Sequence, residues 1–241
     1  MRDSLIFSKH DDAGDYEVEI FDHPKPTTVI VCAHGNGVRR WDGEKFFYAV
    51  AEHFANSAVL LVDQNQPDGD GVRLNPLPIL KSRVMELVYE AKRRYPETPL
   101  VVMGHSMGCG VASLLKTDNI KAMVFVAPAA GKPEQSLIAR YGPETVNGKT
   151  VTTSDGRNKV ITREYYESVK GVSWEDAYAD LVKRFSPVYV YESSNDEIVG
   201  DGRLMHREIP FARYTVIAGA KHNLSGAPLA KLFAELDGLQ F

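Results

Sequence analysis

Ser106 is the residue whose setting most strongly indicates chemistry, because it is the centre of the pentapeptide Gly-His-Ser-Met-Gly at 104–108. The apolar run 99–103 precedes it and the small and apolar residues 109–115 follow it, which predicts a strand, a sharp turn and a helix. The two glycines allow a tight, strained bend that raises the serine hydroxyl above the edge of a sheet. We therefore expect Ser106 to be a nucleophile; the alternative is a strand-to-helix loop that holds a buried serine.

A serine hydroxyl is a weak nucleophile at neutral pH, so it needs a histidine base that a carboxylate orients. Two histidines follow Ser106 in the chain, His206 and His222. His222 lies on a loop directly after the last predicted strand, whereas His206 lies in 203–207, a segment predicted as a helix that leaves the site. We expect His222 to be the base.

The candidate acid is Asp196, which follows the predicted strand 187–191 on a loop. A carboxylate there can reach the ring nitrogen of His222 that faces away from the serine. Glu197 and Asp201 are close to it in sequence and stay open as alternatives, either as the acid or as solvated side chains.

Attack on an acyl carbon also needs hydrogen-bond donors for the negative charge that develops on the acyl oxygen. The backbone N–H of Met107, next to the nucleophile, is one expected donor. The loop 34–38, His-Gly-Asn-Gly-Val, supplies the second, the N–H of Asn36, while Gly35 lets the backbone approach a substrate. The alternative is a plain glycine-rich turn; a dinucleotide site is excluded because Gly35 and Gly37 lack the third glycine of that motif.

These residues need a scaffold that brings several loops to one edge, and the remaining sequence predicts one. Apolar strand-like segments alternate with amphipathic helical segments at 45–55 and 80–95, which is typical of an α/β fold with a mostly parallel, doubly wound sheet. The predicted strands are 15–21, 27–33, 58–63, 100–103, 121–126, 187–191 and 213–217. Segment 15–21 alternates polar and apolar residues, so we expect an edge strand with one solvent-exposed face.

The alternation breaks at residues 129–184, which are polar and rich in turns. Within them, 144–162 contains two β-prone pieces around an Asp-Gly turn signal, and two helices should follow, at 163–169 and after a capping Ser173. We expect 129–184 to form a small inserted cap over the carboxyl ends of the strands, and 1–128 with 185–241 to form the core. The alternative is a surface loop without function.

Aromatic residues of the expected cap are candidates for lining a substrate pocket. We single out Tyr165, Tyr166 and Trp174 there, together with Trp41, which follows the glycine-rich loop. Ordinary core packing is the alternative for each of them.

Composition argues against several classes of function. The 241 residues are 44% hydrophobic and 25% charged with a net charge of −4, which offers no basic surface to nucleic acid. No segment is long and apolar enough to span a bilayer, and the first residues lack a signal-peptide pattern.

The two cysteines, Cys32 and Cys109, lie in apolar runs that predict buried free thiols. We expect a cytoplasmic protein, either a monomer or a homodimer.

The chain resembles α/β-hydrolases over nearly its whole length. The positions that match this family, in its order, are His34-Gly35, the pentapeptide 104–108, Asp196 and Gly219-x-x-His222. The size and the insertion with its predicted hairpin are similar to small carboxylesterases of the feruloyl or cinnamoyl type. Glu192-Ser193 departs from a His-Gly pair that many members carry before the acid loop. Haloalkane dehalogenases and dienelactone hydrolases share the scaffold but use Asp or Cys as the nucleophile, against which Ser106 argues.

This resemblance implies a serine carboxylesterase that hydrolyses soluble short- to medium-chain or aryl, feruloyl-like esters through an acyl-enzyme intermediate. It implies no metal and no cofactor, and a small-molecule ester as the partner. An acyl thioesterase or a monoacylglycerol-type lipase with the same residues is the alternative enzyme. A non-catalytic ligand-binding protein on the hydrolase scaffold is the alternative of another class.

Overall fold

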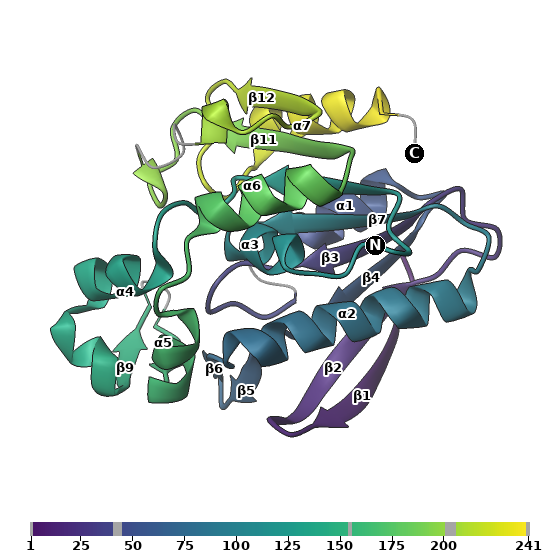
Figure 1. Ribbon diagram of the computed structural model, residues 1–241. Coiled ribbons are helices and arrows are strands. Elements are labelled where there is room, and N and C mark those ends of the chain that lie inside the picture. Colours follow the sequence, from purple (N-terminus) through teal and green to yellow (C-terminus); the bar gives the residue numbers. More distant parts are fainter. Residues whose placement is uncertain (1, 41–44, 154–155, 201–205, 240–241) are drawn as a thin grey trace.

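The computed structural model describes residues 2–40, 45–153, 156–200 and 206–239 (Figure 1). Within these ranges the core is an eight-stranded sheet in the order β1-β2-β4-β3-β7-β8-β11-β12. The first two pairings, β1 with β2 and β2 with β4, are antiparallel, and every later pairing is parallel. The bounds are β1 Leu5–Asp11, β2 Gly14–Phe21, β3 Val29–Ala33, β4 Ala58–Val62, β7 Leu100–His105, β8 Ala122–Val126, β11 Val188–Ser193 and β12 Arg213–Ile217.

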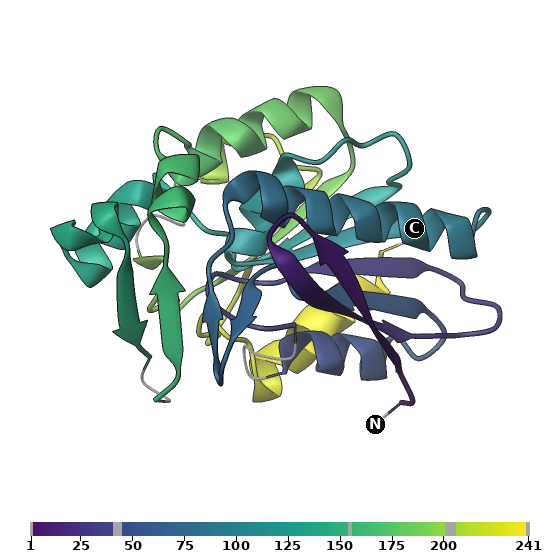
Figure 2. The same cartoon turned by 90° about the horizontal axis from the view of Figure 1, so that it is seen from below.

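Helices cover both faces of this sheet, which explains the continuous apolar runs of its central strands. In β3, Val29 and Val31 belong to one hydrophobic cluster, and Ile30 and Cys32 belong to the cluster on the opposite face. Figure 2 shows α2 and α6 on one side of the sheet and α1 and α7 on the other. The bounds are α1 Phe46–His53, α2 Leu77–Arg94, α3 Met107–Ser113, α6 Trp174–Arg184 and α7 Gly226–Asp237. The predicted doubly wound α/β fold is confirmed.

The first strand is the part of the sheet that the sequence pattern failed to predict. We expected 15–21 at the edge, but this was wrong, because β1 pairs with β2 and takes the edge position. Strand β1 is largely solvated, with Leu5 and Ile6 each about half exposed, so it lacks the apolar run that predicted the other strands. In β2, the last four residues, 18–21, are all buried.

Residues 129–184, which we call the cap, contain the predicted hairpin and the two predicted helices. The hairpin is β9 Lys149–Thr152 with β10 Asn158–Ile161, and α5 Arg163–Val169 and α6 follow it. The Ser173 side chain accepts a hydrogen bond from the Asp176 N–H, as its capping role requires. The helix α4 Pro133–Tyr141 and a short 3₁₀ turn at Pro143–Asn147 precede the hairpin and were not predicted.

A second sheet joins the cap to an earlier part of the chain. Between β4 and α2, the strands β5 Gln66–Asp68 and β6 Gly71–Arg73 form a small hairpin, and β6 pairs in parallel with β10. The order of this sheet in the described residues is β5-β6-β10-β9. A Cβ at Gly71 would lie 1.9 Å from the Asn158 carbonyl oxygen, so only glycine allows this approach. Strands from outside 129–184 therefore complete the cap's sheet.

Cys32 and Cys109 are buried free thiols, as predicted, and burial raises the pKa of both. Across the described ranges, every helix is too short or too polar to cross a bilayer.

Candidate active site

Ser106 lies at the turn between β7 and α3, in a backbone conformation that few residues with a side chain adopt. Its φ is 55° and its ψ is −125°, so the backbone is strained at this position. The flanking glycines permit the turn. A Cβ at Gly104 would lie 2.7 Å from the Cys109 backbone, and one at Gly108 would lie 1.9 Å from the Ala33 carbonyl oxygen. The glycines of the pentapeptide therefore allow the start of α3 to lie directly against the end of β3.

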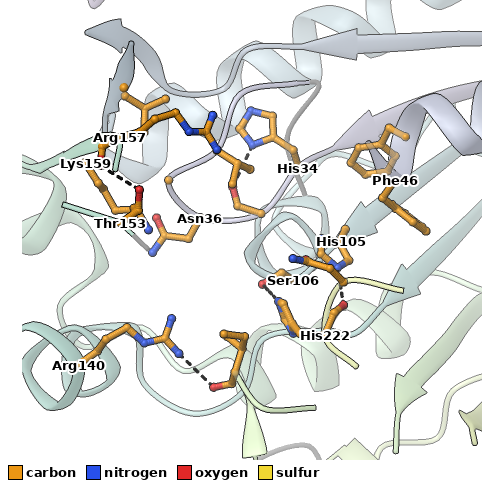
Figure 3. A pocket seen from close by; sticks show the side chains of 18 of the residues that line it. His34, Asn36, Phe46, His105, Ser106, Arg140, Thr153, Arg157, Lys159 and His222 are labelled. Atoms are coloured by element: carbon orange, nitrogen blue, oxygen red, sulfur yellow. Dashed lines mark hydrogen bonds between the residues drawn. The ribbon is translucent and has the colours of Figure 1, made fainter. Parts of the chain in front are cut away.

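Three side chains from separate loops form a continuous hydrogen-bonded chain. His222 Nε2 lies 2.9 Å from Ser106 Oγ, and His222 Nδ1 lies 2.8 Å from Asp196 Oδ2 (Figure 3 shows the first pair). Both His222 and Asp196 are buried, at 6% and 5% exposure. A nucleophile, a base and a carboxylate in this order can transfer a proton from the hydroxyl to the imidazole.

Asp196 is held as an anion by its neighbours. Burial acts to raise the pKa of Asp196, but the hydrogen bond with His222 and the N–H groups of Ile198 and Val199 outweigh it and keep that pKa below its ordinary value. These two N–H groups donate to Asp196 Oδ1 at 2.9 and 2.8 Å. A charged Asp196 can therefore orient the imidazole and stabilise its protonated form.

The alternatives left open by the sequence do not occupy these positions. Glu197 accepts a hydrogen bond from the backbone N–H of His222 at 3.1 Å, so it supports the histidine loop and not the ring. His206 is fully buried beside Tyr178 and Glu192. Asp201 lies outside the described residues.

His105 is a functional candidate that the sequence did not indicate. Its Nε2–H donates to the His222 carbonyl oxygen at 3.0 Å, and its ring packs against Phe46. Burial, and next the charge on His222, lower the pKa of His105 to about 3. His105 is therefore a neutral donor that positions the His222 loop. Its place between glycine and serine in the pentapeptide carries no signal for this role.

The glycine-rich loop 34–38 lies beside the nucleophile. His34 Nε2 accepts from the Gln64 N–H at 2.9 Å, which leaves the proton on Nδ1 to donate to the Gly35 carbonyl at 2.9 Å. A Cβ at Gly35 would lie 3.2 Å from Ser106 Cβ, so a side chain there would press on the serine. Asn36 follows and borders the same space as Ser106.

Met107 is the first residue of α3, so its N–H has no acceptor within the helix. Both predicted oxyanion donors, Asn36 and Met107, are thus brought to the nucleophile.

Two hollows meet at Ser106, and Asn36, Arg140 and Ile198 also border both. The first hollow has a volume of about 370 Å³ and lies between the core loops and the cap hairpin (Figure 3). The second has about 320 Å³ and lies under α4 and the start of α6.

The structure separates the predicted substrate-binding residues. Gly35 borders the first hollow, and Tyr165 and Trp174 border the second. Tyr166 borders neither of them and is packed in the core. Trp41 lies outside the described residues. In the part of the chain that the structure describes, no group of three or more His, Cys, Asp or Glu side chains is arranged to hold a metal ion.

Residues 30–235 match the alpha/beta hydrolase family, so the chain belongs to this family. A curated relative, the monoglyceride lipase homologue of monkeypox virus, is 24% identical over 234 residues, covering 83% of each chain. The solved structure of Est1E from Butyrivibrio proteoclasticus matches with a TM-score of 0.69 at 18% identity, covering 96% of this chain and 95% of that one.

A structure of ferulic acid bound to Est1E matches with a TM-score of 0.70 at 19% identity, covering 92% and 93%. The esterase domain of a Rhodothermus marinus protein matches with a TM-score of 0.65 at 17% identity, covering 98% and 96%. The family membership supports a hydrolase, and the structural matches show a likeness of fold to Est1E, which has been solved with ferulic acid bound.

Proposed function

We propose that this protein is a serine carboxylesterase that acts on soluble short- to medium-chain or aryl esters. The observation that carries the proposal is the hydrogen-bonded chain from Ser106 through His222 to Asp196, placed where two hollows meet. A serine in a strained turn, with a base at 2.9 Å and with Asn36 and Met107 as candidate N–H donors, is suited to acyl transfer.

In the first half of the reaction, Ser106 Oγ attacks the acyl carbon while His222 Nε2 takes the hydroxyl proton. The negative charge passes to the acyl oxygen, which accepts hydrogen bonds from the N–H groups of Asn36 and Met107. The tetrahedral intermediate then collapses, the bond to the alcohol oxygen breaks, and His222 returns the proton to that oxygen. The acyl group is left on Ser106.

In the second half, a water molecule gives a proton to His222 and attacks the acyl-enzyme. Collapse of this second intermediate releases the carboxylic acid and restores the Ser106 hydroxyl. Asp196 remains ionised throughout and stabilises the imidazolium in both halves.

The size of the two hollows supports the substrate range. Volumes of about 370 and 320 Å³ fit an ordinary small-molecule site divided into two parts, one for each half of an ester. The likeness of fold to Est1E, which has been solved with ferulic acid bound, supports an aryl ester. The likeness to the viral monoglyceride lipase homologue supports a monoglyceride as the second candidate.

The test is hydrolysis of p-nitrophenyl butyrate together with labelling by a fluorophosphonate probe. Wild-type protein should turn over the ester and take the label, and Ser106→Ala should do neither while keeping its circular dichroism spectrum. Rates on feruloyl esters, monoacylglycerols and acyl-CoA thioesters, measured in parallel, rank the substrate classes. Binding without turnover or labelling would instead indicate a ligand-binding protein.

A further inference from the structure

The first hollow is lined by positive side chains, although the whole chain has a net charge of −4. Arg140, Arg157 and Lys159 border it, and none of its described lining residues is an aspartate or a glutamate. In Figure 3, Arg140 extends from one side of the space around Ser106, and Arg157 and Lys159 lie on the opposite side. All three belong to the cap, two of them to the hairpin end and one to α4.

Lys159 is the most unusual of the three because it is 92% buried by area, with only 8% exposure. Its aliphatic part lies over the glycine-rich loop, where a Cβ at Gly37 would be 2.0 Å from Lys159 Cε. Its Nζ lies 3.3 Å from the Tyr141 hydroxyl and 5.6 Å from the centre of that ring. Both of these partners are neutral, and among the described residues no salt bridge joins the Lys159 ammonium to a carboxylate.

Arg140 is the second cation without a described carboxylate partner. Arg140 is exposed, and its Nη2 donates to the Ile198 carbonyl oxygen at 3.3 Å, a neutral partner that holds the guanidinium at the rim of the hollow. Ile198 follows Asp196 by two residues, so this contact also ties the cap to the acid loop. Two cations held at a substrate cavity in this way favour a negative ligand.

The position of His222 decides which half of the ester should carry that negative group. His222 and Asn223 border the first hollow only, whereas Met107, Tyr165 and Trp174 border the second only. The leaving oxygen must receive its proton from His222 Nε2, so the alcohol half departs through the first hollow. The second hollow, bordered by the aromatic side chains of Tyr141, Tyr165 and Trp174, then holds the acyl half. The cation that it does not share with the first hollow is the exposed Lys132.

We propose that the alcohol or thiol half of the substrate carries a carboxylate or phosphate group that Lys159 and Arg140 bind. This inference rests on the proposed hydrolase function and adds the substrate class to it. Both residues would determine specificity without taking part in the bond-breaking steps.

The experiment compares pairs of similar esters of which one member carries a negative charge. The butyrate esters of 4-hydroxybenzoate and of 4-hydroxybenzamide have the same shape, but only the first is negative in the alcohol half. The p-nitrophenyl esters of glutaric acid (as the half-ester) and of valeric acid place the same charge difference in the acyl half. Butyryl-CoA presents phosphates in the leaving half and so separates a phosphate ligand from a carboxylate ligand.

The wild-type preference is read as the ratio of kcat/KM for the benzoate ester over the benzamide ester. Lys159→Gln and Arg140→Gln should each lower this ratio about tenfold at low ionic strength through a higher KM, and Lys159→Arg should restore most of it. Because the same two esters are used throughout, their different intrinsic reactivity cancels. Arg93→Gln removes the same charge from an exposed residue of α2 that pairs with Glu90, and should leave the ratio unchanged.

A ratio that stays within twofold of wild type in both Lys159→Gln and Arg140→Gln, or a charge preference confined to the glutarate ester, would overturn the proposal. Lys159-dependent hydrolysis of butyryl-CoA, with no such dependence for the benzoate ester, would assign the group as a phosphate. If the neutral benzamide ester is not hydrolysed and Ser106 takes no fluorophosphonate label, the proposed function itself fails, which is distinguishable from failure of the charge preference.

Discussion

Replacement of His105 by glutamine should remove a pH-dependent part of the stability of this protein. The pKa of His105 is about 3 in the fold, against an ordinary value of 6.5. As the pH falls, the unfolded chain therefore binds the proton first, and folding must then exclude it. Protonation of His105 in the unfolded chain therefore does not affect the stability above about pH 6.5. Below that pH it lowers the free energy of unfolding progressively, until the pH reaches about 3.

The magnitude follows from the width of that window. At pH 4.5, two pH units below the ordinary value, the neutral His105 costs about 3 kcal/mol of folding free energy. The ring is 5% exposed, so little solvent screening reduces this figure. A glutamine at 105 does not titrate, and its amide N–H₂ can still donate to the His222 carbonyl oxygen. The variant should avoid the loss.

The assay is urea unfolding of wild type and His105→Gln at pH 7.5, 6.0 and 4.5, followed by circular dichroism. At pH 7.5 the variant should be the less stable, because it loses the ring contact with Phe46. Between pH 7.5 and pH 4.5, the free energy of unfolding of His105→Gln relative to wild type should rise by about 3 kcal/mol. Titrations common to both proteins cancel, and His10→Gln, at a side chain that is 75% exposed, controls for the loss of a surface histidine. A difference constant within about 0.5 kcal/mol across the three pH values would refute the reasoning.

Three further predictions concern the nucleophile turn and its acid. Asp196→Asn should lower kcat for p-nitrophenyl butyrate about a thousandfold or more, because the imidazolium loses its anionic partner; a loss under tenfold would contradict the assigned role. Gly108→Ala should destabilise the fold by about 3 kcal/mol or more in urea titrations, because its Cβ would lie 1.9 Å from the Ala33 carbonyl oxygen. In the control Gly238→Ala, the nearest atom to the new Cβ is 3.4 Å away, so stability should change little. Ser106→Gly should be more stable than Ser106→Ala by about 1 kcal/mol of unfolding free energy, because glycine relieves the strain at φ 55°. Its melting temperature should therefore be the higher of the two, and equal melting temperatures would argue against strain at this position.

Much of the core was predictable because its strands are buried on both faces. Runs such as 29–33 and 100–103 must then be apolar without interruption, and that pattern is distinct from an amphipathic helix. Ser106, Asp196 and His222 follow the carboxyl ends of three predicted strands, so the predicted parallel sheet alone places them at one edge. The last of these strands, β12, is partly exposed and ends the sheet. The structure brings these three side chains together as expected.

The parts that could not be predicted depend on contacts between distant segments. Strand β1 is mostly solvated, and β5 and β6 have three residues each, too few for a periodic pattern. The direction in which Lys159 points depends on the pairing of β10 with β6, which no local sequence specifies. Tyr165 and Tyr166 are adjacent and chemically alike, and both are packed in the core, yet only Tyr165 also borders a hollow at Ser106.

The parallel pairing of β6 with β10 has a consequence for exchanging caps between related enzymes. A chimera that replaces only 129–184 would remove β10, so β6 would lose the strand with which it pairs in parallel and the Leu74 N–H would lose the Val160 carbonyl that accepts from it. An unpaired edge of that kind attracts other strands and promotes aggregation. The exchangeable unit is therefore discontinuous in the sequence: residues 66–73 must move together with 129–184 for a new cap to arrive with its own sheet complete. The incoming α6 must also fit α3 and the main sheet, which this helix covers.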